Sequence, residues 1–396
     1  MNKILSSGLF LLACLLAMGA AAAFAIVTWE VWVTQSDGDM LERYHEYSWF
    51  REGTYPNSHV ETQVGDRPQR YTVYPPFAIP LFAVFFEPGG MAQGRLVLEG
   101  LSLASLALMG WYGRRALAPY GSGFAALGSV LGVAIADNAT AIWVGQFSII
   151  CVGLVVLQMT LLDRDRPVAA GVCWALAMIK PNIALPFAAL FLLGRHFVGA
   201  VVGGLVLIAL AGVTCWWTEV SPLALLDHWG RGQSLRFVEL GYDLGPGAIA
   251  RRTGLDHRLV LVGVASCLIA LVFGLVIATR SWGSAARLPL AAAVSVLGMF
   301  ACYHRQYDNI MLFPALLAAT AVPARTRRPS DVCVAGCLLA SLAIPFWVQG
   351  AAAWFTYRAT ACAWFLGGLY PMVQLMVGRQ GRDYAENAAR IIRDGS

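Results

Sequence analysis

Long apolar runs recur along almost the entire chain and restrict the fold more than any other feature. They are separated by short turns that carry arginine. A helix needs about 20 apolar residues to cross a bilayer, and the runs of about 15 to 24 residues are close to that length. Charged residues make up only 13% of the chain, about half the share found in soluble domains. The sequence therefore predicts an all-α polytopic membrane protein, with residues 1–396 forming one integral-membrane domain.

The arginine-bearing turns predict an orientation, because cytoplasmic loops are enriched in basic residues. Placing these turns inside gives about twelve transmembrane helices, the first over about residues 5–28. A long first extracytoplasmic loop then covers residues 29–91, a second covers 218–258, and residues 379–396 form a cytoplasmic tail. The apolar stretch 77–86 is too short to cross comfortably, so we expect an interfacial or re-entrant helix there.

Three further features narrow the class of protein. Ala23-Phe24-Ala25 imitates a signal-peptide cleavage site, but the apolar run continues to Val33, which favours an uncleaved first span. All nine cysteines are dispersed without a CxxC pair, so neither a disulfide framework nor a metal site is supported. The net charge of +5 comes from arginine clusters in loops, so it does not imply a nucleic-acid partner.

The polar, aromatic-rich segment 36–86 indicates a functional site at the membrane surface. Asp37 and Asp39 stand at its start, directly after the first span, and Tyr74-Pro75-Pro76-Phe77 closes it. Asp37-Gly38-Asp39 resembles the DxD motif of nucleotide-sugar enzymes, in which two carboxylates hold a divalent metal. Alternatively, Asp39 caps a helix over 40–50 by accepting backbone N–H groups. A carboxylate here can also act as a general base toward a hydroxyl presented from water.

Lys180 is the second candidate functional residue. The chain has 28 basic residues, but Lys180 and Lys3 are its only lysines. Lys180 separates two apolar runs, 172–179 and 183–193, and a charge near membrane depth is costly and by default functional. A compact ammonium suits a phosphate group. The alternative is that its side chain extends to the interface and only solvates the charge.

Two more polar positions adjoin predicted spans. Gln146 lies inside the predicted fourth span, about residues 140–161, where an amide either joins helices or touches a sugar. His304, beside Arg305, follows another span and either caps helix carbonyls or donates to a phosphate oxygen. In the predicted topology, six polar positions fall at the extracytoplasmic face, namely Asp37, Asp39, Tyr74, Gln146, Lys180 and His304. Nucleotide-binding glycine loops and a serine-hydrolase elbow are missing from the sequence, so those enzyme classes lack support.

Taken in order, short motifs across about residues 30–320 resemble glycosyltransferase family 87. They are Asp39-x4-Tyr44, Gly53-x-Tyr55, Tyr74-Pro75-Pro76-Phe77, Gly145-Gln146-Phe147-Ser148, Lys180-Pro181 and Tyr303-His304-x3-Asp308. The resemblance implies a GT-C fold and a polyprenyl-phosphate sugar as donor. It implies transfer of a hexose, with mannose preferred, or of a pentose to a lipid or glycan acceptor. The transfer is expected to invert the anomeric configuration and to take place at the extracytoplasmic side of the plasma membrane.

The resemblance also implies roles for individual residues. Asp39 is expected to be the catalytic base, although the additional Asp37 leaves that assignment open. His304, Lys180 and Arg305 are expected to bind the donor phosphate. The remaining expected substrate contacts are Tyr44, Tyr74, Gln146 and Asp308. No metal cofactor is required for a monophosphate leaving group, although the DxD-like pair keeps one possible.

The segment 57–70 is longer and more polar than the family pattern leads us to expect. We expect this difference to change the shape of the acceptor side of the site. Two other classes remain as alternatives. A polytopic transporter or lipid flippase of envelope precursors accounts for the spans, but it would show paired halves with corresponding broken helices, and no repeat is visible. A non-catalytic membrane assembly factor leaves the gathering of polar residues on one face without a reason.

Overall fold

The computed structural model describes residues 2–34, 38–59, 72–193, 195–239, 253–254, 256–279, 286–301, 306–326 and 328–343, with 363–364, 366–371 and 373 near the C-terminus. Every regular element in these ranges is a helix, which confirms the predicted all-α class. Asp37, His304, Arg305 and the tail 379–396 lie outside the described residues.

Helices follow one another along the described part of the chain. The first half contains α1 (Asn2–Thr34), α2 (Gly38–Arg51), η1 (Pro56–His59), η2 (Pro76–Phe82), α3 (Ala83–Phe86), α4 (Gly90–Leu117), η3 (Ala118–Tyr120), α5 (Ser122–Val130), α6 (Asp137–Val144), α7 (Ser148–Asp163) and α8 (Pro167–Ala177). The second half contains α9 (Pro181–Ala184), η4 (Leu185–Ala188), α10 (Ala189–Leu193), α11 (Phe197–Thr218), α12 (Pro222–Glu239), α14 (His257–Thr279), α15 (Arg287–Ala301), η6 (Gln306–Leu312), α16 (Phe313–Thr326) and α17 (Pro329–Ala343).

Several of these helices are long and apolar enough to cross a bilayer. Among the described residues there are five, or six if the bent pair α6–α7 counts as one span. The five segments are Ser6–Glu30, Gly90–Tyr120, Phe197–Thr218, Val262–Thr279 and Tyr307–Thr326. Five shorter apolar helices accompany them. A polytopic membrane protein is thus confirmed, and the count of about twelve stays a prediction.

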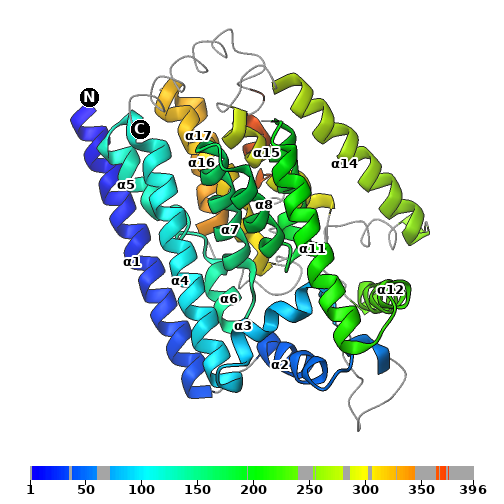
Figure 1. Ribbon diagram of the computed structural model, residues 1–396. Coiled ribbons are helices and arrows are strands. Elements are labelled where there is room, and N and C mark those ends of the chain that lie inside the picture. Colours follow the sequence, from blue (N-terminus) through cyan, green and yellow to red (C-terminus); the bar gives the residue numbers. More distant parts are fainter. Residues whose placement is uncertain are drawn as a thin grey trace.

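The long helices stand side by side as a bundle (Figure 1). α1, α4 and α5 form one flank, α7, α8 and α11 pack together in the middle, and α15, α16 and α17 form a third group. The segment containing η6 and α16 is central, since 83% of its membrane-length window is buried inside the protein, against 6% for α1. α16 therefore belongs to the core of the fold, whereas α1 presents its apolar side chains outward, as a lipid-facing helix does.

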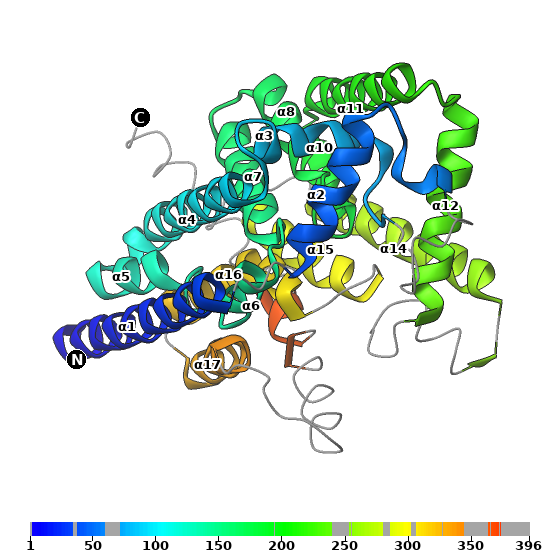
Figure 2. The same cartoon turned by 90° about the horizontal axis from the view of Figure 1, so that it is seen from below.

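The segment between α1 and α4 folds over one end of the bundle, the lower end in Figure 1. Figure 2, seen from that end, shows α2 crossing beneath the helices. Two hydrogen bonds attach this cap to α11: Thr214 Oγ1 donates to the Pro76 carbonyl at 2.8 Å, and Trp217 Nε1 donates to the Phe50 carbonyl at 2.7 Å. The predicted helix over 77–86 forms as η2 and α3, and it packs between α2 and α4.

Three breaks in the helical chain lie within the bundle. The expected continuous span over about 140–161 is wrong, because α6 and α7 meet at 116° across residues 145–147. A second break separates α8 from α9 at residues 178–180, and η6 is a short 3-10 turn before α16. Non-helical backbone at membrane depth is tolerated only where protein or water satisfies its polar groups. These breaks therefore mark where polar side chains gather.

Candidate functional site

The three breaks meet next to the N-terminus of α2 and bring together residues far apart in sequence. η6 packs against both α6 and α7, α9 packs against α7, and α2 touches α6. Each break contributes polar side chains: Gln146 and Ser148 from the first, Lys180 from the second and Asp308 from η6. Asp39, in the first turn of α2, completes the group.

Two glycines permit the close approach that carries Asp39 to Gln146. Gly38 has φ +47° and a Cβ added there would lie 2.9 Å from the Cα of Val144. Gly145 has φ +74°, and its added Cβ would lie 2.5 Å from the Cβ of Met40. Only glycine occupies this backbone region without steric cost and leaves the space free. The Gly38 between the two aspartates thus has a packing role of its own.

Lys180 and Asp308 form a buried ion pair at the centre of the group. The Lys180 Nζ lies 2.5 Å from Asp308 Oδ1, and the two side chains are 8% and 0% exposed. Lys180 also donates to Gln146 Oε1 and to Ser148 Oγ, each at 2.8 Å. These contacts use all three N–H groups of the ammonium. Lys180 is held inside the protein, so it does not extend to the interface as the alternative interpretation supposed.

Further hydrogen bonds satisfy the Asp308 carboxylate. Ser148 Oγ donates to Oδ1 at 2.6 Å, and Asn182 Nδ2 donates to Oδ2 at 3.0 Å. The neighbouring Asn309 donates to the buried Asp137 at 2.5 Å, which attaches η6 to α6 as well. A buried charge is tolerated when it is paired and fully hydrogen-bonded. Both acidic positions therefore contribute to holding η6 in place.

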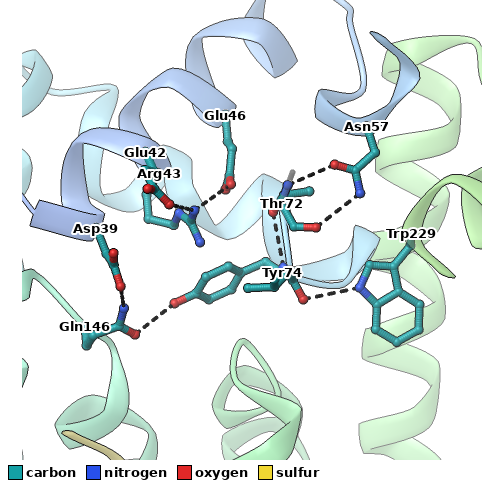
Figure 3. A network of polar contacts seen from close by, with 10 residues as sticks. Asp39, Glu42, Arg43, Glu46, Asn57, Thr72, Tyr74, Gln146 and Trp229 are labelled. Atoms are coloured by element: carbon teal, nitrogen blue, oxygen red, sulfur yellow. Dashed lines mark hydrogen bonds and ion pairs between the residues drawn. The ribbon is translucent and has the colours of Figure 1, made fainter. Parts of the chain in front are cut away.

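Gln146 connects this ion pair to Asp39, and Figure 3 shows its contacts with Asp39 and Tyr74. Its Nε2 donates a short hydrogen bond to Asp39 Oδ2, while the Tyr74 hydroxyl donates to its Oε1 at 3.3 Å. Among the described residues, Gln146 alone donates a hydrogen bond to the Asp39 side chain, which is only partly buried. Asp39 thus accepts from a side-chain amide and not from the backbone of α2. Its second oxygen stays available to accept a proton.

Arg43, one turn after Asp39, borders the same space. Its guanidinium lies 4.6 Å from the centre of the Tyr74 ring and pairs with Glu46 at 2.7 Å and Glu42 at 3.1 Å. Burial lowers the pKa of Arg43, but the nearby carboxylates, Glu46 first, outweigh it and raise that pKa above the ordinary value. Burial also raises the pKa of the Tyr74 hydroxyl, which keeps it protonated as a donor to Gln146.

The chain that carries Tyr74 is attached on both sides, as Figure 3 shows. Asn57 exchanges two hydrogen bonds with the Thr72 backbone, at 2.9 and 3.2 Å, and Trp229 of α12 donates to the Val73 carbonyl at 3.3 Å. The Tyr74 ring then packs edge-on against Phe82 and Phe147. Tyr74 is therefore positioned by a polar clamp behind it and an aromatic cluster around it.

Five of the predicted site residues lie close together, and one of the described ones does not. Asp39, Tyr74, Gln146, Lys180 and Asp308 come together in one network. Tyr44 stays outside it and packs edge-on against Phe86 at 5.5 Å between ring centres. Ser148 and Asn182 have no role predicted from the sequence, although Ser148 closes the Gly145–Ser148 motif and Asn182 follows Lys180-Pro181. Adjacency to a motif was the available signal.

The described residues include no group of three or more His, Cys, Asp or Glu side chains close enough to hold a metal ion. The network presents one carboxylate, at the end of an apolar bundle, with an oxygen that no other described residue contacts by a hydrogen bond, next to a charge-balanced cluster. Such an arrangement can accept a proton from a hydroxyl near a membrane-embedded molecule. It can also keep that carboxylate in a fixed place.

Comparison with known proteins finds a family match for the chain. The family model described as "Glycosyltransferase family 87" matches residues 71–303, more than half of the chain. No curated protein and no solved structure matches the chain. The matched range contains Tyr74, Gln146, Ser148, Lys180 and Asn182; Asp39 and Asp308 lie on either side of it.

Proposed function

The chain belongs to glycosyltransferase family 87, and we propose that it transfers a sugar from a polyprenyl-phosphate donor to a hydroxyl of a lipid or glycan acceptor, with Asp39 as general base. Family membership makes the protein a membrane glycosyltransferase. The donor class, the sugar (mannose before other hexoses or a pentose), the inverting course and the acceptor class are parts of the proposal.

The Asp39 carboxylate is the single observation that carries the proposal. Its Oδ2 accepts from Gln146, its other oxygen is available, and the side chain is partly exposed where α2 crosses the end of the bundle. A base in this place reaches a hydroxyl arriving from water while a lipid-linked donor approaches from the apolar side. General-base catalysis requires a carboxylate oxygen within reach of the hydroxyl.

The proposed reaction is one displacement. Asp39 takes the proton of the acceptor hydroxyl as the acceptor oxygen bonds to the anomeric carbon of the sugar. The bond between that carbon and the phosphate oxygen breaks, and the polyprenyl phosphate leaves with the electron pair. Because the nucleophile attacks opposite the leaving group, the anomeric configuration inverts, and no second carboxylate is needed as nucleophile.

The leaving phosphate needs donors of its own. We assign this role to His304 and Arg305, which follow α15 and precede η6. An imidazolium or guanidinium donor forms charge-assisted hydrogen bonds with phosphate oxygens, and arginine does so in a bidentate geometry. Tyr44 and Tyr74 are proposed on the substrate side, whereas Asp308, which is 0% exposed and paired with Lys180, is not. Asp37 is the alternative base. A metal is not required in this scheme, and the site is proposed to face the extracytoplasmic side of the plasma membrane.

A glycosyltransferase and a flippase can be distinguished by whether the bond between the sugar and the phosphate of the donor breaks. The purified protein is reconstituted in liposomes with a polyprenyl-phosphate mannose labelled in the sugar, and with an extract of envelope lipids and glycans as acceptor. We expect labelled acceptor and free polyprenyl phosphate to appear together, and both to be lost in Asp39→Asn. Movement of intact donor across the bilayer without cleavage would instead identify a flippase and contradict the proposal.

A further inference from the structure

We propose that Lys180 is a positioning residue for the Asp39 base, acting through the side-chain amide of Gln146. This inference rests on the proposed function, since it concerns how the base is held. It differs from the phosphate-binding role that the family resemblance implies for Lys180. The reason lies in the partners that the structure gives to each polar atom between Lys180 and Asp39.

The three N–H donors of Lys180 are all occupied by protein oxygens. An ammonium has three N–H donors and no acceptor. The Lys180 Nζ contacts three oxygens, from Gln146 at 2.8 Å, Ser148 at 2.8 Å and Asp308 at 2.5 Å. The side chain is only 8% exposed, and the carboxylate of Asp308 balances its charge. A phosphate oxygen would have to displace one of these partners to reach Nζ.

The neighbours of Gln146 fix the orientation of its side-chain amide. An amide has an acceptor end and a donor end of nearly the same shape, so its neighbours decide which way it points. Lys180 and Tyr74 both donate to Oε1, and Asp39 accepts from Nε2. In the flipped amide, NH₂ would face the ammonium and C=O would face the carboxylate. Both contacts would be repulsive, so Lys180 fixes the donor end toward Asp39.

Lys180 is itself held by its counter-ion, Asp308. Asp308 accepts from Ser148 at 2.6 Å and from Asn182 at 3.0 Å, so the counter-ion is itself fixed by α7 and α9. The ammonium also lies 4.7 Å from the centre of the Tyr307 ring. The order of contacts from η6 to α2 is thus Asp308, Lys180, Gln146 and Asp39. Each polar group in this series limits the orientation of the next.

Positioning and phosphate binding predict different kinetics. If Lys180 orients the base, Lys180→Met and Gln146→Leu lower kcat and leave the donor KM near its original value, because the lost interaction acts in the chemical step. The expected loss is about ten- to a hundredfold, the effect of one hydrogen bond to a charged group. If Lys180 binds the donor phosphate, Lys180→Met raises the donor KM and Gln146→Leu does not reproduce it.

A double-mutant cycle with Asp39→Asn provides the decisive readout. Once the base is gone, its positioning no longer matters, so Lys180→Met is expected to change the residual rate by less than about threefold in the Asp39→Asn background. Multiplicative effects would overturn the inference and leave the proposed base in place. Full activity in Asp39→Asn would instead overturn the proposed base itself, so the two failures are distinguishable.

Gln146→Leu and one control variant protect the test against simple misfolding. Lys180→Met leaves Asp308 as a buried uncompensated charge, which is strongly destabilising. Gln146→Leu keeps the ion pair intact, so it decides the matter if Lys180→Met does not fold. Asp137→Asn is the matched control: it alters another buried hydrogen bond to the same turn, with Asn309 at 2.5 Å, without touching Gln146 or Asp39. We expect its kcat to stay within about threefold of the unmodified enzyme.

Discussion

The close approach of α2 to the break between α6 and α7 gives the sharpest test of how the site is assembled. Gly145 sits at that break with φ +74° and ψ +46°, in the left-handed region. Gly145→Ala adds a Cβ that would lie 2.5 Å from the Cβ of Met40, 3.2 Å from its N and 3.3 Å from its Cα. Because Met40 is on α2 and two of these atoms are backbone, a change of side-chain rotamer cannot relieve the overlap.

The expected cost has two parts. An alanine in the left-handed region costs about 1–2 kcal/mol. Forcing an extra carbon into a filled space costs about 1–3 kcal/mol. Together they destabilise the native packing by about 2–5 kcal/mol, which the chain relieves by moving α2 away. Since Met40 adjoins Asp39, that movement separates the Asp39 carboxylate from Gln146, and we expect transfer activity to fall more than tenfold.

The assay compares Gly145→Ala with Gly204→Ala, both in detergent-purified protein. Gly204 lies within α11, and a Cβ added there meets nothing within 4 Å. Its replacement is expected to be neutral or to stabilise the helix by up to about 1 kcal/mol. Thermal melting followed by intrinsic fluorescence reports stability, and sugar transfer reports the site. Equal melting temperatures and equal activity for the two variants would refute the packing argument.

Three further predictions follow from the same structure. Asp39→Asn should lower kcat by about two to four orders of magnitude, the range for loss of a general base, and Asp37→Asn should do less; the reverse order in steady-state kinetics would move the base to Asp37. In a background free of exposed cysteines, Thr253→Cys should react with an impermeant thiol reagent on intact cells and Ser330→Cys should not, and labelling at Ser330→Cys alone would invert the proposed orientation. The Tyr55 hydroxyl is buried and has no hydrogen-bond partner among the residues that the structure describes, and burial raises its pKa, so Tyr55→Phe should leave the melting temperature unchanged or higher; a clear decrease would show that this hydroxyl stabilises the fold.

The sequence alone determined the class of protein and the segments that carry its chemistry. Run length against bilayer thickness predicts a polytopic helical protein without knowledge of any contact. Lys180 and Gln146 were found because a charge or an amide within an apolar run needs a partner, and that need is visible locally. Asp39 was found because it follows a span and begins a polar segment. These are properties of single residues and their immediate surroundings.

The tertiary structure decided which residue partners which. Nothing near Lys180 in the sequence identifies Asp308, 128 positions away, as its counter-ion, or Gln146, 34 positions away, as its acceptor. The bend of 116° between α6 and α7 was also hidden, because the two helices taken together are long and apolar enough to be taken for one span. A hydrogen bond depends on distance and direction between atoms, and only the packing of α2, α7, α9 and η6 sets these. The sequence determined which groups need partners, and the fold determined that Lys180 faces the protein and that, among the described residues, Gln146 alone donates to Asp39.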